Sequence, residues 1–318
     1  MDKKSYRTRN WSDYNKALVQ RGSITFWFDA KCIAAWQNTE KTGKRGRPQK
    51  YNDAAIHCGL MFKALFKLTF RATMGFIKSL MEMLKLKLDA PDYTLLCKRQ
   101  KDISTLLPST GKKSEKLNIV VDTTGLKVYG EGEWKVRQHG WVKHRLWRKL
   151  HLAVNSGSHE IEAFELTDLG IQDCEGLSML IDKIPSSIKS CKGDGAYDSF
   201  SCYEKSQQRN FKLITPPARN AVTSDENRKS KKKASAGAVK KRDDAITRVR
   251  HVGRKQWKIE TKYHRRSLAE TAMFRVKQLL GNHLSTRKFE NQKVEMGIWC
   301  QILNKMTKLG MPKTIAMN

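Results

Sequence analysis

The stretch NIVVD, residues 118–122, decides the fold, because a short run of apolar, β-branched residues ends there on an acid. Such a run predicts a buried strand. An acid at its end needs a physical reason in a chain with 31 acidic residues against 62 lysines and arginines. Two further acids stand out, Asp194 in CKGDGAYD and Glu270 in a helical pattern. Mg²⁺ prefers oxygen ligands of this kind, so Asp122, Asp194 and Glu270 are candidate metal ligands.

Strand and helix patterns extend from this run in both directions. Predicted strands cover residues 118–122, 149–154, 161–166, 188–192 and 211–215, and predicted helices cover residues 174–184, 199–208, 264–280 and 294–309. Three strands followed by alternating helices and strands predict an α/β fold, in which a mixed sheet carries helices on its faces. This order is compatible with a ribonuclease-H-like core.

The charge of the chain points to a polyanionic partner. The formal net charge is +31 and the sequence pI is about 10.0. Nucleic acid is the leading candidate, and a membrane surface is the weaker one, because no apolar run approaches the roughly 20 residues that span a bilayer. The first residues lack the apolar core of a signal peptide, so we expect a cytoplasmic protein. The seven cysteines form no Cys-x-x-Cys pair, which favours reduced thiols over zinc or disulfides.

Residues 1–112 are predicted to form a helical N-terminal region. Residues 53–88 have a helical pattern in two parts, and a third short helix can begin at Asp92 or Thr94 and ends in the basic CKRQK segment. Three short helices with basic residues on the last are typical of a helix-turn-helix module that binds DNA. A helical bundle used for dimerisation is the alternative.

Two basic segments have two interpretations each. Arg45 and Arg47 in KTGKRGRPQK resemble the arginine hook that enters the minor groove of AT-rich DNA, but a basic linker is the favoured interpretation. Residues 218–262 interrupt the strand-helix alternation with a lysine-rich tract, which predicts an inserted loop. This loop either closes over bound DNA or is a solvated, disordered insertion.

The region around Glu270 combines several chemical groups at helical spacing. Tyr263, Glu270 and Lys277 are seven residues apart, and Arg266 precedes Glu270 by four, so a continuous helix would present all four along one stripe. Arginine and lysine beside a metal ligand suit DNA phosphates. The alternative is local, since Ser267 and Glu270 match a capping box.

Three segments together resemble one family. VVDTTGLK, GDGAYD and the pattern Tyr263-x-x-Arg266-x-x-x-Glu270-x-x-x-x-x-x-Lys277 resemble the DDE transposases of bacterial insertion sequences, specifically the IS-five family with its Tyr-Arg-Glu-Lys signature. The resemblance extends through residues 128–154 and, more weakly, into the N-terminal helices. It implies that residues 113–318 form a ribonuclease-H-like DDE catalytic domain.

The resemblance also implies a metal site. In such enzymes the two aspartates and the glutamate, here Asp122, Asp194 and Glu270, hold two Mg²⁺ ions, and Mn²⁺ accepts the same ligands. One site then serves both DNA hydrolysis and strand transfer.

The implied function is that of a transposase. It would bind double-stranded DNA at terminal inverted repeats, assemble as a homo-oligomer and join the cut ends to target DNA in the bacterial cytoplasm. Arg266 and Lys277 would hold phosphates of the transposon end, and Tyr263 would position the same end. Two other functions stay open: a non-catalytic DNA-binding protein derived from a transposase, and a ribonuclease-H-type nuclease or resolvase that cuts without joining.

Overall fold

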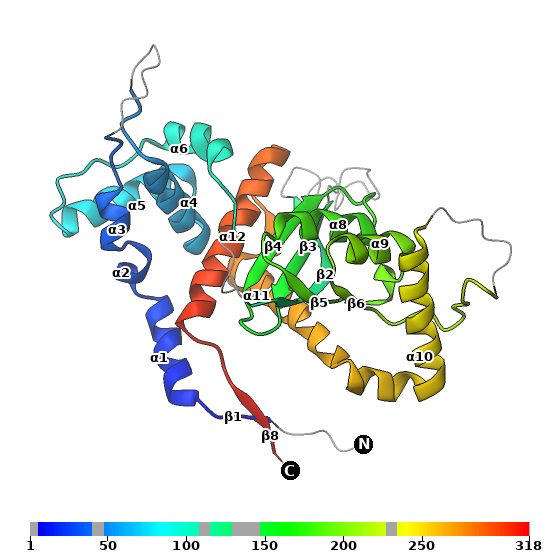
Figure 1. Cartoon of the computed structure of the whole chain (residues 1–318). Coiled ribbons are helices and arrows are strands. Elements are labelled where there is room, and N and C mark those ends of the chain that lie inside the picture. The colour runs from blue at the N-terminus through cyan, green and yellow to red at the C-terminus, as the bar shows by residue number, and fades with distance from the viewer. Residues whose placement is uncertain (1–5, 40–47, 108–114, 129–146, 227–233, 318) are drawn as a thin grey trace, which may run out of the picture. The chain divides into compact units, whose positions relative to one another are not determined.

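The chain forms two compact units in a computed structural model (Figure 1). Unit 1 comprises Met1–Leu106 together with Lys288–Asn318, and unit 2 comprises Leu107–Arg287. The structure describes residues 6–39, 48–107, 115–128, 147–226 and 234–317.

Unit 2 is built on a mixed β-sheet. Its strands are β2 (Leu117–Val128), β3 (Trp147–Asn155), β4 (Ile161–Thr167), β5 (Ile188–Lys192), β6 (Lys212–Ile214) and β7 (His283–Leu284). Their order is β4-β3-β2-β5-β6, with β7 paired to β2. β2, β3 and β4 run antiparallel, whereas β5 and β6 continue parallel to β2. The predicted mixed α/β sheet is confirmed.

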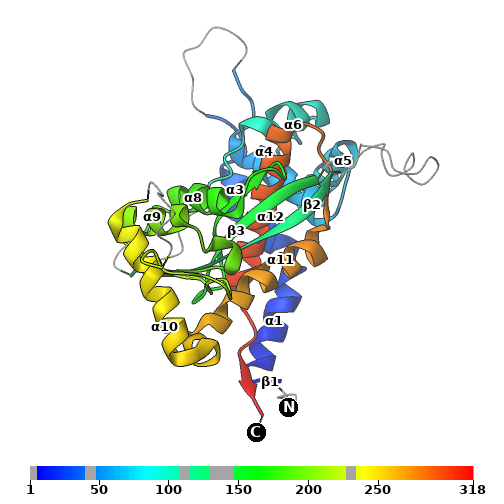
Figure 2. The ribbon, with the colours of Figure 1, turned by 90° about the vertical axis from the view of Figure 1, so that its right-hand side faces the viewer.

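Helices cover both faces of this sheet. The helical elements of unit 2 are α8 (Asp173–Lys183), η2 (Gly195–Tyr197), α9 (Phe200–Gln208), α10 (Ala236–Glu260), η3 (Tyr263–Arg266) and α11 (Ser267–Leu280). α8 packs on β3, β4 and α9, whereas α11 packs on β2 and β3. Figures 1 and 2 show α8 and α9 on one side of the sheet and α11 on the other. We call these the α8 face and the α11 face.

The alternation of side chains along β2 assigns its residues to the two faces. Ile119 and Val121 belong to the apolar cluster on the α8 face, which also contains Leu177, Leu180 and Ile181 of α8. Because successive strand residues point to opposite faces, the residues between and after them point to the α11 face. β2 also runs six residues beyond Asp122, where the sequence prediction had ended the strand.

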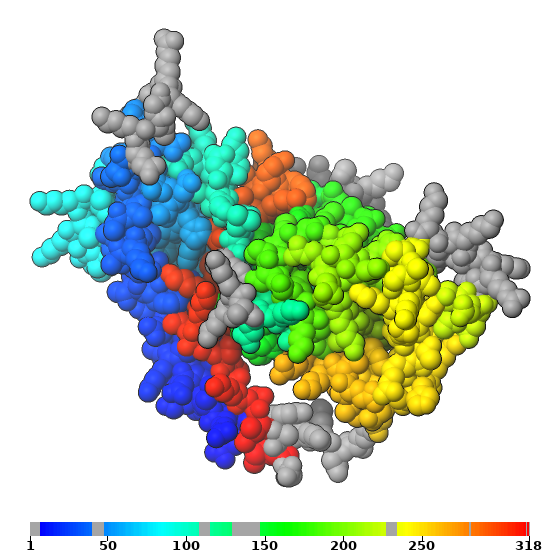
Figure 3. Space-filling view, in the orientation of Figure 1, coloured from blue at the N-terminus to red at the C-terminus, as the bar shows by residue number. Residues whose placement is uncertain are grey.

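The basic insertion at residues 218–262 is mainly helix, which corrects the predicted loop. α10 covers Ala236–Glu260, begins at an N-cap Ser235 that accepts from the Ala238 N–H, and bends at Gly253 (φ 77°, ψ 152°). Alanines and a broad spread of long basic side chains favour a helix once the segment has a surface to pack on. That surface is α9, and Figure 3 shows the yellow residues of α10 against the green residues of α9.

Unit 1 is helical with one small sheet. Its elements are β1 (Tyr6–Thr8), α1 (Trp11–Arg21), α2 (Ile24–Trp27), α3 (Ala30–Ala34), α4 (Asp53–Leu65), α5 (Phe70–Met83), α6 (Tyr93–Arg99), η1 (Gln100–Asp102), α12 (Phe289–Leu309) and β8 (Thr314–Ala316). Polar side chains cap four of its helices, at Asp29, Asn52, Thr69 and Asp92. Three successive helices, α4 to α6, therefore lie where the sequence placed them.

One basic residue of the expected DNA-contacting helix serves the fold instead. Arg99, at the end of α6, is buried, and its guanidinium donates to the Tyr51 carbonyl and to the Asp53 carboxylate at the start of α4. It ties α6 to α4, so it is not free for a phosphate.

The last 31 residues belong to unit 1, although the predicted domain division assigned residues 113–318 to the catalytic domain. α12 packs against α1, α4 and η1 within unit 1, and β8 pairs antiparallel with β1. α12 is rich in buried apolar side chains, which need a partner surface that its own sequence does not specify. No helix among the residues described is long and apolar enough to cross a membrane.

Candidate active site

Strand register places two of the candidate ligands side by side. β2 and β5 are parallel neighbours, and Val120 pairs with Lys192. Asp122 lies two residues beyond Val120, and Asp194 lies two residues beyond Lys192. Because the two strands run parallel, residues at equal distances from this pair lie at the same height along the sheet, so the two carboxylates are neighbours. The repulsion that Asp194 exerts on Asp122 contributes to the raised pKa of Asp122, which shows that the two charges interact.

Glu270 reaches this point from the first turn of α11. The Lys277 ammonium donates to the Thr124 hydroxyl on β2 at 2.6 Å, which fixes α11 along the strand. Thr124 is two residues after Asp122 and so lies on the same sheet face. Sequence analysis missed Thr124 because it ended the strand at Asp122, and extending the strand pattern by two residues would have found it.

Arg266 joins two of the carboxylates. One guanidinium nitrogen lies 3.5 Å from Asp122 Oδ2, and another donates to Glu270 Oε1. The capping-box alternative for Glu270 does not hold, because α11 has no side-chain cap and the Ser267 hydroxyl donates to the His264 carbonyl. The predicted continuous helix is also interrupted: Tyr263 and Arg266 lie in the 3₁₀ helix η3, before α11 begins.

The electrostatics of the site are those of crowded, partly buried acids. Burial raises the pKa of Asp122. The hydrogen bond from the Thr123 N–H and the charge of Arg266 lower this pKa, whereas the charges of Asp194 and Glu270 raise it further. Burial also raises the pKa of the Tyr263 hydroxyl against the effect of Arg266, and the same three acids add to the rise. Tyr263 therefore stays a neutral hydrogen-bonding group near the carboxylates at physiological pH.

The turn that carries Asp194 is held from several directions. Asp194 Oδ1 accepts from the Ala196 N–H at 2.9 Å, and the buried Thr215 hydroxyl donates to the Asp194 carbonyl. Gly193 is required there, because a Cβ atom would come within 2.4 Å of the buried Tyr197 ring. Thr215 follows β6 in the chain, and only the sheet brings it to Asp194, so sequence analysis missed it.

Asp198 connects this turn to α10. Its carboxylate accepts two hydrogen bonds from the Arg242 guanidinium, at 3.2 and 3.1 Å, and only 4% of its side chain is exposed. Asp198 does not cap the following helix, because Ser199 caps α9 by accepting from the Cys202 N–H. Asp198 is an anchor for the inserted helix and is not a metal ligand candidate.

The donor set suits a divalent metal in its chemistry but is not gathered into a ligand cluster. Carboxylate oxygens are the donors that Mg²⁺ and Mn²⁺ prefer. Within the described ranges, no group of three or more His, Cys, Asp or Glu side chains is close enough to hold a metal ion. Arg266, which bonds to Asp122 and Glu270, supplies the positive charge between them.

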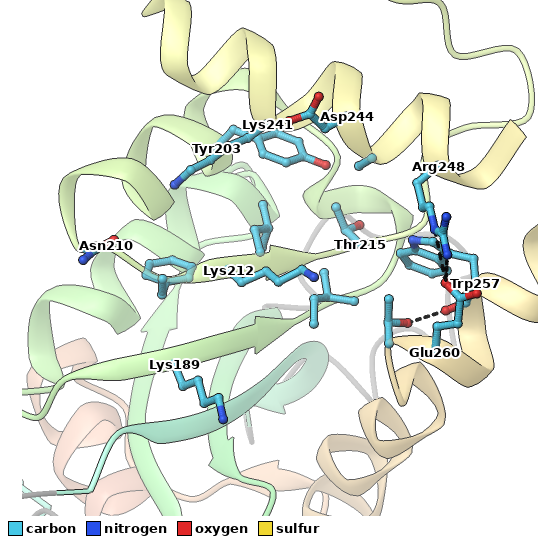
Figure 4. A pocket seen from close by; sticks show the side chains of 15 residues that line it. Lys189, Tyr203, Asn210, Lys212, Thr215, Lys241, Asp244, Arg248, Trp257 and Glu260 are labelled. Atoms are coloured by element: carbon cyan, nitrogen blue, oxygen red, sulfur yellow. Dashed lines mark hydrogen bonds and ion pairs between the residues drawn. The ribbon is translucent and has the colours of Figure 1, made fainter. Parts of the chain in front are cut away.

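A cavity of about 810 Å³ lies beside this site, between β6 and α10. Figure 4 shows Lys212, Thr215, Trp257 and the ion pair of Arg248 with Glu260 among its lining residues. Trp257 also stacks on Tyr263, with ring centroids 5.6 Å apart. The cavity therefore borders the catalytic candidates through Thr215 and Trp257, although it contains none of the three acids.

The sequence-predicted residues divide into two groups. Six of them lie in unit 2, on β2, the β5–η2 turn, η3 and α11. They are Asp122, Asp194, Tyr263, Arg266, Glu270 and Lys277. Arg45 and Arg47 lie outside the described residues.

Comparison with known proteins gives the family. A family model described as a transposase DDE domain matches residues 113–305, and a second model of the same description matches residues 19–131. A solved piggyBac transposase synaptic complex with hairpin DNA aligns with 93% of this chain and 77% of its own chain, at 10% identity and a TM-score of 0.38. The first match covers more than half of the chain and includes all three acids. The chain belongs to the DDE transposase family and is a transposase, an enzyme class that generally uses divalent metal ions.

Proposed function

We propose that this protein is the transposase of a bacterial insertion sequence of the IS-five family, that it binds the element's terminal inverted repeats, and that it catalyses metal-dependent cleavage and strand transfer. The observation that supports the proposal is the β2–β5 register, which directs Asp122 and Asp194 to the same end of the sheet, together with Arg266, which contacts both Asp122 and Glu270. The order of strands, antiparallel then parallel, supports a ribonuclease-H-like core.

Asp122, Asp194 and Glu270 would hold the metal, two Mg²⁺ or Mn²⁺ ions. When bound, the metal supplies an activated oxygen nucleophile and charge stabilisation for the leaving 3′-oxygen. With the carboxylates on a metal, the Arg266 guanidinium would be available for a phosphate, which it can bind through two parallel hydrogen bonds. Lys277 donates to Thr124 in this structure, and the phosphate contact expected of it from the sequence stays a prediction.

The neutral hydroxyl of Tyr263 suits a phosphate oxygen or sugar of the same DNA end. Burial keeps this hydroxyl protonated, so it donates a hydrogen bond and adds no negative charge to an acidic site. Tyr263 lies on η3, seven residues before Glu270, and the charges of all three acids contribute to its raised pKa.

We assign the recognition of double-stranded DNA ends to unit 1 through a helix-turn-helix module formed by α4, α5 and α6, with the protein acting as a homo-oligomer in the bacterial cytoplasm. The four-residue connection between α4 and α5 is short enough for such a module. Lys98 and Lys101 supply charge near its third helix. Arg45 and Arg47 extend this assignment to the minor groove.

The test is a strand-transfer reaction. Purified protein is incubated with labelled DNA carrying the repeats that flank the coding sequence, a target plasmid and Mg²⁺, with Glu270→Gln as the control. Joined products from the wild type alone support the proposal. Cleavage without joining favours a nuclease or resolvase, and binding without either favours a non-catalytic DNA-binding protein.

A further inference from the structure

A buried lysine on the α11 face lacks a counter-charge. Lys192 is only 5% exposed, yet within the part of the chain that the structure describes its side chain makes no hydrogen bond or ion pair. Its neighbour Cys191 belongs to the apolar cluster of the α8 face, so Lys192 points to the α11 face. Val120 is its partner across the strands, which places Lys192 one strand away from the line of Asp122 and two residues before Asp194.

The groups around Lys192 are also cations. Lys212 lies on the neighbouring strand β6, where Ser190 pairs with it, and it points to the same face. Burial lowers the pKa of Lys192, and the charges of Arg265, Lys262 and Lys212 lower it further. η3, which carries Arg265, packs on both β2 and β5. Four cations from three segments therefore converge on one side of the carboxylates.

Lys262 ends α10 in the left-handed conformation, with φ 51° and ψ 38°, as Lys67 and Lys85 do after α4 and α5. This turn leads the chain directly into η3, which packs on β2 and β5. Lys262 and Arg265 therefore enter the surroundings of Lys192 together.

We propose that Lys192, Lys212, Lys262 and Arg265 form a binding site for a backbone phosphate of DNA, next to the phosphate on which the carboxylates act. Two residues of strand separate Lys192 from Asp194, about 7 Å at ~3.3 Å per residue. This distance is comparable to one nucleotide step along a DNA strand. The inference rests on the proposed function, because it names a second phosphate of the same substrate.

An anion at this site resolves the charge problem of the fold. The Lys192 ammonium has no counter-charge among the described residues, and like charges from three segments repel each other. A phosphate oxygen accepts from several of these donors at once, and its charge offsets theirs. Arg266, the next residue after Arg265, contacts Asp122 and Glu270, so the proposed site adjoins the carboxylates along η3.

The first experiment uses Lys192→Met in the full-length chain, because methionine keeps the buried stem and removes the charge. Affinity for a short duplex of fixed sequence is measured over a range of KCl concentrations without divalent metal. We expect a roughly 10-fold loss of affinity, the effect of one charge-assisted hydrogen bond. We also expect the slope of log affinity against log salt to fall by about 0.9. The thermal midpoint should stay unchanged or rise, because an unpaired buried charge is gone.

Two further variants make the result specific. Lys262→Asn removes the second charge but tolerates the left-handed conformation, so it should weaken binding and lower the salt slope while the thermal midpoint holds or rises. Lys205→Met removes one charge from the α8 side, where Lys205 pairs with the exposed Asp182, and should leave affinity and slope unchanged. A lower midpoint with an unaltered salt slope in Lys192→Met would show a structural lysine and overturn the proposal.

To locate the bound phosphate, one phosphate of the DNA strand at a time is replaced by an uncharged methylphosphonate, and affinity is measured for each position. The wild type should lose affinity when the position next to the cleaved phosphate is neutral, and Lys192→Met should show no further loss there. Competition by millimolar inorganic phosphate alone, with no position-dependent effect, would mean a general anion site and would contradict the proposal. If the wild type neither binds nor cuts DNA, the proposed function fails; if it cuts and Lys192→Met binds like the wild type, only this inference fails.

Discussion

The two faces of the unit 2 sheet differ in what their side chains contact, although both are made by the same strands. On the α8 face, Ile119 and Val121 of β2 pack with Leu180 and its neighbours in a continuous apolar cluster. On the α11 face, Asp122 and Thr124 of the same strand bond to charged side chains of η3 and α11. A strand that alternates every residue can thus bury one face for stability and present chemistry on the other.

The comparison teaches that the carboxylates sit on a rigid support. The α8 face anchors the strands by burial, so β2 holds Asp122 in the sheet, while the turn after β5 carries Asp194 and α11 carries Glu270. Burial raises the pKa of Asp122 and repulsion from Asp194 and Glu270 adds to it, a cost that the apolar face offsets. Substitutions on the α11 face should affect activity, and substitutions on the α8 face should affect stability; they are ordered from the largest expected effect to the smallest.

Glu270→Gln should abolish activity while leaving the fold intact. It removes a carboxylate from the α11 face at a side chain that is half exposed, so the free energy of unfolding should change by no more than about 0.5 kcal/mol. Metal-dependent cleavage should fall on the order of 1,000-fold. The matched control is Glu175→Gln, an exposed glutamate in the first turn of α8 on the other face, which should cut like the wild type. Normal cleavage by Glu270→Gln would remove Glu270 from the site.

Leu180→Ala should have the reverse effect. The side chain is fully buried in the α8 face, so its truncation should lower the free energy of unfolding by about 2–5 kcal/mol, measured by denaturant titration. Cleavage per folded molecule should be unchanged. Met179→Ala, one residue earlier and 38% exposed, should cost much less. Equal losses at the two positions would show that the α8 face is not the source of stability.

His151 should make the stability of the sheet depend on pH. It is fully buried on β3 and donates to or accepts from the Thr167 hydroxyl at 3.0 Å, and burial lowers its pKa to about 4. Its contribution is complete above the unfolded pKa of about 6.5, because the imidazole is neutral in both states. As the pH falls from 6.5 towards 4, only the unfolded state gains a proton, so stability should fall by up to about 3 kcal/mol.

Denaturant titrations of the wild type and His151→Asn across this pH range test the effect. The variant should be less stable at pH 7, because it loses packing against Gly176, but it should lack this part of the pH dependence. Parallel curves for the two proteins between pH 6.5 and pH 4 would contradict the assignment.

The smallest expected effect comes from the bond that docks α11. Lys277→Met and Thr124→Val should each cost about 1 kcal/mol of unfolding free energy, the typical net value of a hydrogen bond. A double-mutant cycle should show that the two losses are not additive. If the losses add, the two side chains do not interact, and α11 is held by its apolar contacts alone.

Much of the local structure could be predicted from the sequence, since it follows from short-range patterns. The run before Asp122 reads as a strand because β-branched side chains suit a pleated, buried surface. β5 was predicted at its observed bounds, residues 188–192. The resemblance to DDE transposases singled out the three acids, whose role stays a prediction, and the match of residues 113–305 to a transposase DDE domain confirms the family.

Other features depend on contacts between segments that are distant in the chain. The lysine-rich insertion was expected to be a loop, but Arg242 on α10 binds the buried Asp198 and gives the helix a surface to pack on. The last helix, α12, was assigned to the catalytic region, and it packs with α1 and α4 in unit 1. Neither partner surface leaves a signal in the local sequence.

The sequence by itself determined the strands, the basic charge and the set of acids, because alternation, β-branching and residue spacing act within a few neighbours. Only the tertiary structure decided that β5 runs beside β2 in a register that aligns Asp194 with Asp122. It also decided that Arg266 bridges Asp122 and Glu270, and that Lys192 is buried among cations. Strand pairing and burial are long-range, since they depend on which surfaces meet when the whole core closes.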